Sequence, residues 1–127
     1  MKLHGEEHEN TLISALNYAN SLVDLEQAPE AEEARSLLHK TIPVARRVLG
    51  EGHRLTLKMR WVYAQSLYEA DHATLDDLRE AVTTLEDTEQ IARRVFGGAH
   101  PIAVEVERDL GKARVALRAR EMSPGSA

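Results

Sequence analysis

The chain has 127 residues, of which 43% are hydrophobic and 29% are charged, and its formal net charge is −5. These values suit a single globular domain and argue against general affinity for nucleic acid, whose phosphates attract clustered lysine and arginine. The absence of cysteine excludes disulfides, thiol nucleophiles and thiolate metal sites, and no apolar run approaches the roughly 20 residues that span a bilayer. Because the first residues also lack the apolar core of a signal peptide, we expect a cytoplasmic protein that binds neither nucleic acid nor membrane.

The predicted elements are all helices, because alanine, leucine, glutamate and arginine are abundant while aromatic residues make up only 4% of the chain. In chain order these helices span residues 9–25, 29–49, 54–71, 75–96 and 101–119. The second begins at Pro29, whose fixed φ suits the first helical position, and glutamates follow it near the positive end of the helix dipole. The last begins in the same way, at Pro101.

Further signals mark the interior and the ends of the second and fourth helices. Pro43 lies inside the second helix and removes a backbone hydrogen bond, so we expect a bend there, with a broken helix as the alternative. The fourth helix begins with a capping box formed by Thr74 and Asp77. Both helices end in paired arginines followed by a glycine, Gly50 or Gly97, which suits a left-handed helix terminus.

The fifth helix differs from the first and third, because Arg108, Asp109 and Arg114 replace residues that are mostly apolar or amide-bearing there. We interpret it as a capping helix whose charged residues form the polar outer face that a helical stack needs at its end. The apolar pattern survives at Val104, Leu110 and Val115. The last residues, 123–127, are predicted to form a disordered tail.

The phrase Gly-x-x-His occurs three times, at Gly5–His8, Gly50–His53 and Gly97–His100, with spacings of 45 and 47 residues. Between residues 34–50 and 81–97 the chain repeats itself at a constant offset of 47. Identical residues occupy eight of these 17 positions: Ala34/Ala81, Leu38/Leu85, Thr41/Thr88, Ala45/Ala92, Arg46/Arg93, Arg47/Arg94, Val48/Val95 and Gly50/Gly97. Self-similarity at this period predicts an array of like helix–turn–helix units.

These units resemble the tetratricopeptide repeat, in the longer form found in kinesin light chains. The resemblance rests on the stretch 48–57, Val-Leu-Gly-Glu-Gly-His-Arg-Leu-Thr-Leu, and on its counterpart at 96–101, Phe-Gly-Gly-Ala-His-Pro. The stretch 16–19, Leu-Asn-Tyr-Ala, and the Glu-Ala pairs at 33–34 and 80–81 also match the family's pattern. The resemblance covers about residues 4–119. It implies an all-α fold, an α-α superhelix or solenoid of about two and a half repeats and five helices, within a domain of residues 1–122.

The resemblance further implies that the first helices of the units line a concave groove that binds a partner. Aligning Ala19, Ala64 and Gly111 as small, closely packed residues places seven side chains toward this groove: Asn17, Asn20, Trp61, Gln65, Tyr68, Arg108 and Lys112. Asn17 matches the family's asparagine that hydrogen-bonds the backbone of a bound extended peptide. Trp61 and Tyr68 suit the anchoring of an apolar side chain, and Trp61 fits equally well as a core residue against the neighbouring unit.

The histidines are the residues that most invite a chemical role. His8, His53 and His100 recur at the spacing of the units, so we interpret them as structural caps rather than as ligands of one metal ion. His39 lies beside Lys40 on a predicted helix, as in a histidine phosphotransfer domain, and this is the one catalytic alternative. No phosphate-binding glycine loop, serine elbow or paired acid motif is present in the sequence. We therefore predict no enzyme activity, no metal and no cofactor.

The predicted function is non-catalytic binding of a protein or peptide partner in the groove. Two and a half units make only a short groove. This motivates an alternative in which the apolar ends of the stack dock onto another copy and form a homo-oligomeric scaffold. The two predictions differ in where the binding surface lies, either on the concave face or at the ends of the stack.

Overall fold

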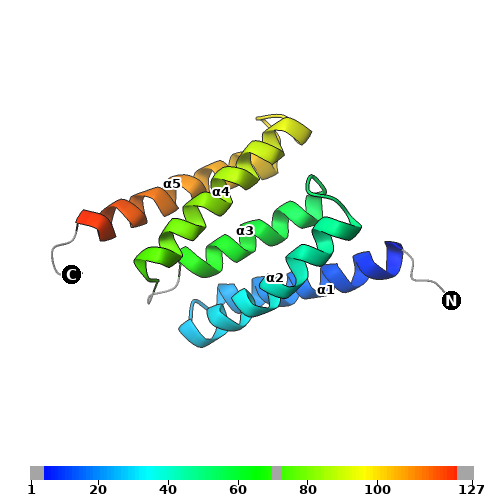
Figure 1. Cartoon of the computed structure of the whole chain (residues 1–127), viewed down its shortest axis with the longest axis horizontal. Helices are drawn as coiled ribbons and strands as arrows, with labels where there is room; N and C mark the ends of the chain where they lie inside the picture. The colour runs from blue at the N-terminus through cyan, green and yellow to red at the C-terminus, as the bar shows by residue number, and fades with distance from the viewer. Residues whose placement is uncertain (1–4, 70–72, 123–127) are drawn as a thin grey trace.

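The computed structural model describes residues 5–69 and 73–122, and every regular element in them is a helix. In chain order these are α1 (Gly5–Asp24), α2 (Ala28–Val48), α3 (Arg54–Tyr68), α4 (Leu75–Phe96) and α5 (Pro101–Met122). Each helix runs back antiparallel along the one before it (Figure 1). The predicted all-α class with five helices is confirmed for these residues. The predicted disordered tail, 123–127, lies outside the described residues.

The helix bounds agree with the prediction best at α4 and least at α1. Helix α4 has the predicted bounds, and α2 and α5 differ from theirs by three residues or fewer. Helix α1 begins at Gly5 rather than after His8, so the first Gly-x-x-His phrase lies inside a helix and its predicted capping role is wrong. At its two later occurrences this phrase ends one helix and begins the next, whereas no helix precedes α1 in the described chain. Helix α3 ends at Tyr68, before the predicted residue 71.

The two later copies of the phrase build matching helix starts. His53 and His100 precede α3 and α5, and the Nδ1 atom of each accepts a hydrogen bond from the backbone N–H two residues on, at 3.1 Å in both cases. Gly50 and Gly97 have φ angles of 100° and 91°, in the region that favours glycine. Both hydrogen bonds of the capping box at the start of α4 are also present. The predicted roles of these two histidines, the two glycines and the capping box are confirmed.

Helix α2 continues through Pro43, so the alternative of a broken helix is wrong. The proline is exposed, while Leu38 and Ala45 before and after it are fully buried in the core. Burial of this face holds the helix together although the carbonyl of residue 39 cannot receive the usual backbone hydrogen bond from proline. The bend expected at Pro43 stays a prediction.

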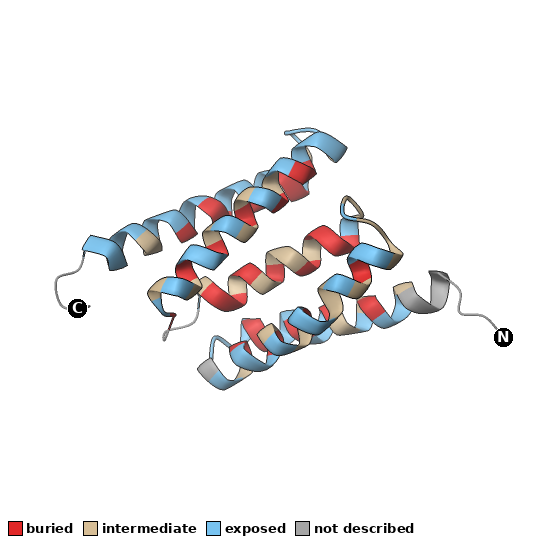
Figure 2. Cartoon of the chain, in the orientation of Figure 1, coloured by how far each residue is buried: buried red, intermediate tan, exposed pale blue. Residues whose placement is uncertain are grey.

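Helix α3 lies at the centre of the molecule. Each helix packs against the next one in the chain, and α3 also contacts α1 and α5 (Figure 1). Buried side chains form two clusters that meet at α3 (Figure 2). On one side, Leu55, Met59 and Val62 pack with α1 and α2. On the other side, Leu57 and Ala64 pack with α4 and α5, so α3 joins the two clusters.

The same type of side-chain contact joins the two helices of each pair, α1 to α2 and α3 to α4. The Tyr18 hydroxyl of α1 donates to Glu33 of α2 at 2.6 Å, and the Tyr63 hydroxyl of α3 donates to Glu80 of α4 at 2.5 Å. The alanine that follows each of these glutamates is fully buried. Equivalent sequence positions therefore make equivalent contacts, and the packing is compatible with a helical repeat.

Several expectations for α5 are wrong. Asp109, expected on a polar outer face, is only 3% exposed and contacts α3. Gly111, aligned with two fully buried alanines, is exposed, and a β-carbon built on it would meet nothing within 4 Å. Val104 and Val115 are also exposed, beside the expected arginines. The cause is that α5 is the last described helix. The corresponding face of α3 is buried in the cluster with α4 and α5, whereas no described helix covers this face of α5.

Candidate functional site

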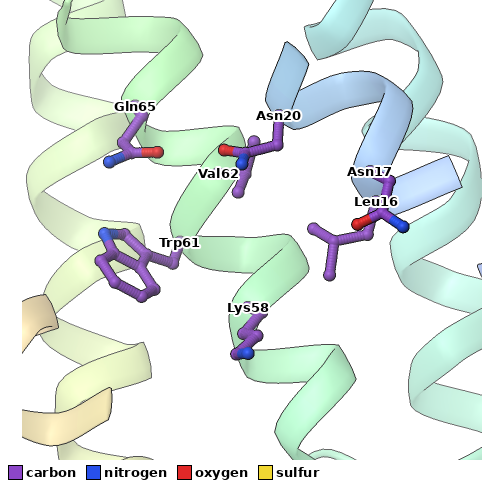
Figure 3. Close-up of a pocket in the computed structure, with 7 residues that line it drawn as sticks. All are labelled: Leu16, Asn17, Asn20, Lys58, Trp61, Val62 and Gln65. Atoms are coloured by element: carbon purple, nitrogen blue, oxygen red, sulfur yellow. The ribbon is translucent and has the colours of Figure 1, made fainter. Parts of the chain in front are cut away.

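A hollow of about 260 Å³ lies between α1 and α3, and we call it the α1–α3 pocket. Figure 3 shows the side chains that line it from the two helices, namely Leu16, Asn17, Asn20, Lys58, Trp61, Val62 and Gln65. Four of the seven predicted groove residues therefore meet at one place: Asn17, Asn20, Trp61 and Gln65.

Helical spacing explains why these side chains converge. Asn17 and Asn20 are three residues apart on α1, and Trp61 and Gln65 are four apart on α3, so each pair shares one face of its helix. A buried leucine from α1 and a buried valine from α3 form the apolar floor between them. Both asparagines are exposed, which leaves their amides available to a ligand.

Asp109 of α5 holds two of the pocket side chains in place. Its Oδ2 atom accepts hydrogen bonds from Trp61 Nε1 at 2.5 Å and from Gln65 Nε2 at 3.1 Å. The amide nitrogen of Gln65 faces the carboxylate because the opposite orientation would set two acceptors against each other. Gln65 thus leaves its carbonyl oxygen for a ligand. Trp61 also packs against the core cluster that α3 shares with α4 and α5, so this side chain both lines the pocket and contacts the core.

The remaining three predicted residues, Tyr68, Arg108 and Lys112, do not line the pocket. The Tyr68 hydroxyl is buried, and burial followed by the charge of Asp109 raises the pKa of this phenol. Arg108 and Lys112 are exposed on α5, and Arg108 is paired with a glutamate one turn away. Both therefore lie outside the α1–α3 pocket, and their assignment to a wider groove stays a prediction.

Sequence reasoning missed Lys58 and Asp109. Lys58 is three residues before Trp61 and therefore on the same face of α3, a relation that the sequence alone contains. Asp109 continues an apolar stripe with Ile102 and Val106 at i, i+4 and i+7, so helical periodicity places it in the core. An acid at a core position indicates a buried polar contact, because an unpartnered buried charge is costly.

His39 lies at a second hollow, of about 270 Å³, between α2, α3 and α4. Its own side chain is exposed. The two arginines that line this hollow are already paired within the chain: Arg46 contacts Glu51 at 2.6 Å, and Arg60 contacts both Glu51 and Asp87. Because these cations are engaged, this hollow offers less to a ligand than the α1–α3 pocket does.

The chain matches no family model, no curated protein and no solved structure. Among the described residues, no three histidine, aspartate or glutamate side chains are grouped to hold a metal ion. No helix in the described part of the chain is long and apolar enough to cross a membrane. The basis for a functional proposal is therefore the chemistry of the α1–α3 pocket, which brings three amides, one ammonium group and an indole ring together over an apolar floor.

Proposed function

We propose that the chain is a tetratricopeptide-like stack of helix pairs, an α-α superhelix of about two and a half units, that binds an extended segment of a partner protein without catalysis. The proposed binding site is the α1–α3 pocket. The observation that carries this proposal is the convergence of three amides and one ammonium group over an apolar floor, on helices that the resemblance assigns to a peptide groove. The absence of cysteine suits binding in the reducing cytoplasm.

The polar side chains of the pocket suit a peptide main chain. Asn17 and Asn20 each donate and accept hydrogen bonds, as a peptide backbone does. Gln65, held by Asp109, offers an acceptor, whereas Lys58 offers a charged donor that is in no ion pair among the described residues. We therefore expect the bound segment to present an N–H group to Gln65 and a carbonyl or carboxylate oxygen to Lys58.

The size of the pocket favours one anchoring side chain of a longer segment. Its volume of about 260 Å³ falls below the roughly 300–1,000 Å³ that is usual for small-molecule sites. The partly buried ring of Trp61, together with Leu16 and Val62, supplies apolar contact, and a tryptophan of this kind is a common basis of a binding hot spot. We expect a ligand with one apolar anchor and an extended main chain on either side of it.

Selection from a random-peptide library on the immobilised protein tests this proposal. The selected peptides should share an apolar residue, and their binding should change the fluorescence of Trp61, the only tryptophan of the chain. The double variant Asn17→Ala/Asn20→Ala should lose about tenfold or more in affinity, because each lost hydrogen bond contributes about 0.5–1.5 kcal/mol.

The matched control is Asn10→Ala, which changes an exposed asparagine of the same helix that does not line the pocket. This variant should bind the selected peptides as the wild type does. Circular dichroism should show the same helix content in all variants. Equal affinities of the double variant and the control would remove the pocket from the function.

A further inference from the structure

The outward face of α5 is exposed, whereas the corresponding face of α3 is buried. The histidine caps of α3 and α5 have the same geometry, which fixes the comparison of the two helices at an offset of 47 residues. On α3, Leu57 and Ala64 are fully buried in the cluster with α4 and α5. On α5 the same positions are Val104, which is 48% exposed, and Gly111, which is also exposed.

Helix α5 lies at the edge of the molecule and is exposed over much of its length (Figure 2). Val104, Gly111, Val115 and Met122 recur at i, i+7, i+11 and i+18 and therefore share one face. The exposed fractions of Val115 and Met122 are 68% and 74%. A glycine in a helix interior is destabilising, and nothing in the described chain approaches the space beside Gly111. A second helix packed closely against this face would use that space.

Charges on the same face make α5 complementary to itself in the antiparallel direction. Glu107 lies in the first half of the helix, and Arg114 and Arg118 lie in the second half. Within the described residues, neither Glu107 nor Arg118 takes part in an ion pair. When two α5 helices cross antiparallel at Gly111, Glu107 of one copy lies opposite Arg118 of the other, and also near Arg114, which pairs with Glu86 of its own chain at 3.0 Å. Val104 of one copy then lies opposite the exposed valine and methionine in the second half of the other.

At the other end of the molecule, the described part of α1 presents mainly polar groups outward, and its exposed Tyr18 is hydrogen-bonded to Glu33 of α2. The outer face of α1 carries Asn10, Ser14 and Ser21, which are all exposed. A head-to-tail stack of copies would set the valines of α5 against these amides and hydroxyls. A two-fold contact between two α5 helices instead buries apolar groups on both sides, and two-fold symmetry is the commonest arrangement of homo-oligomers.

We propose that α5 is a homodimerisation surface, on which a second copy of this chain docks its own α5 antiparallel with Gly111 at the two-fold axis. This surface is separate from the α1–α3 pocket, so the inference goes beyond the proposed peptide binding and does not depend on it. One helix from each copy makes a contact smaller than a standard interface, so we expect a weak dimer.

Sedimentation over a range from about 1 µM to 1 mM, chosen for an interface of this size, tests the dimer. The wild type should shift from monomer to dimer, and Val115→Glu should weaken association by at least about tenfold because it buries an unpaired charge. Leu25→Glu is the matched control, because it makes the same change at a residue that is 56% exposed in the turn after α1, and it should dimerise as the wild type does. A wild type that stays monomeric, or a Val115→Glu variant that associates equally well, overturns the proposal.

The absence of cysteine allows a second test of the arrangement. Gly111→Cys places a single thiol at the proposed axis, and oxidation should link two copies, since bonded cysteines need Cα atoms within about 7 Å. Ser14→Cys, exposed on α1, is the control and should cross-link far more slowly. Equal rates would overturn the α5 contact. A mixed disulfide between the two variants, formed in preference to the Gly111→Cys dimer, would overturn the two-fold arrangement in favour of head-to-tail contact.

Discussion

Asp109 is a charged residue at a core position, and its hydrogen bonds connect α5 to two side chains of the pocket. Asp109→Ala leaves the N–H groups of Trp61 and Gln65 without their acceptor, so the free energy of unfolding should fall by about 2–3 kcal/mol. Urea unfolding followed by Trp61 fluorescence and circular dichroism measures the change. Asp109→Asn keeps an acceptor oxygen and should lose less. An alanine variant as stable as the wild type would show that these contacts do not support the fold.

Glu69 directly follows α3, and partial burial, followed by the charge of Asp109, raises the pKa of its carboxyl group. The folded state therefore favours the protonated form, and the stability that this form contributes is lost as the pH rises through the folded-state pKa. Glu69→Gln should raise the Tm at pH 7 relative to the wild type, and the difference should disappear below about pH 4. Thermal unfolding at both pH values measures this, with Glu32→Gln on an exposed position of α2 as the control. A Tm difference of the same size at both pH values would contradict the prediction.

At the scale of the helices, α2 and α4 correspond at the offset of 47 residues, and Pro43 of α2 has Gln90 of α4 as its counterpart. Pro43→Gln restores a backbone donor to α2 and should raise the free energy of unfolding by about 1–3 kcal/mol. The reciprocal change, Gln90→Pro, removes a donor from α4 and should lower it by about 3 kcal/mol or more. Thermal unfolding followed by circular dichroism compares the two variants. Destabilisation by Pro43→Gln would show that the packing of α2 depends on the proline.

Most of the helix bounds were predictable because α2, α4 and α5 carry clear local start or stop signals and because two units share a constant offset. The capping box of Thr74 and Asp77 and the terminal Gly97 set the bounds of α4 correctly from local chemistry alone. The start of α1 was missed because the same Gly-x-x-His phrase works as a terminator only where a helix precedes it. A local motif does not contain that information.

The pocket side chains on α1 and α3 were predictable, whereas the surroundings of α5 were not. Asn17 and Trp61 were placed correctly because Ala19 and Ala64, which set the alignment, are indeed buried. The same reasoning failed at Gly111, since a small residue is compatible both with close packing and with an uncovered face. Only the arrangement of neighbouring helices distinguishes these two cases.

At the scale of the whole molecule, α3 is the helix that contributes to both core clusters. We therefore expect its backbone amides to exchange with solvent most slowly, while the outer helices α1 and α5 open more often, because each packs on one side only. Hydrogen exchange followed by mass spectrometry measures this order. Raising the protein concentration should protect α5 and leave α1 unchanged if two copies pair through α5. Protection of α1 equal to that of α3 would contradict the expected order.

Helix α3 packs against α2, and α5 packs against α4, through residues at corresponding positions, and both helices begin with the same histidine cap. The junction before Pro101 is therefore a place where the chain can be lengthened. A duplicate of residues 54–100 inserted after His100 would meet α4 through the positions that α5 now uses. It would also present to α5 the surface that α3 now presents to it. In the proposed stack of helix pairs, the number of units is therefore an independent variable, and a longer stack of this kind would keep both the polar face of α1 and the valine-bearing face of α5.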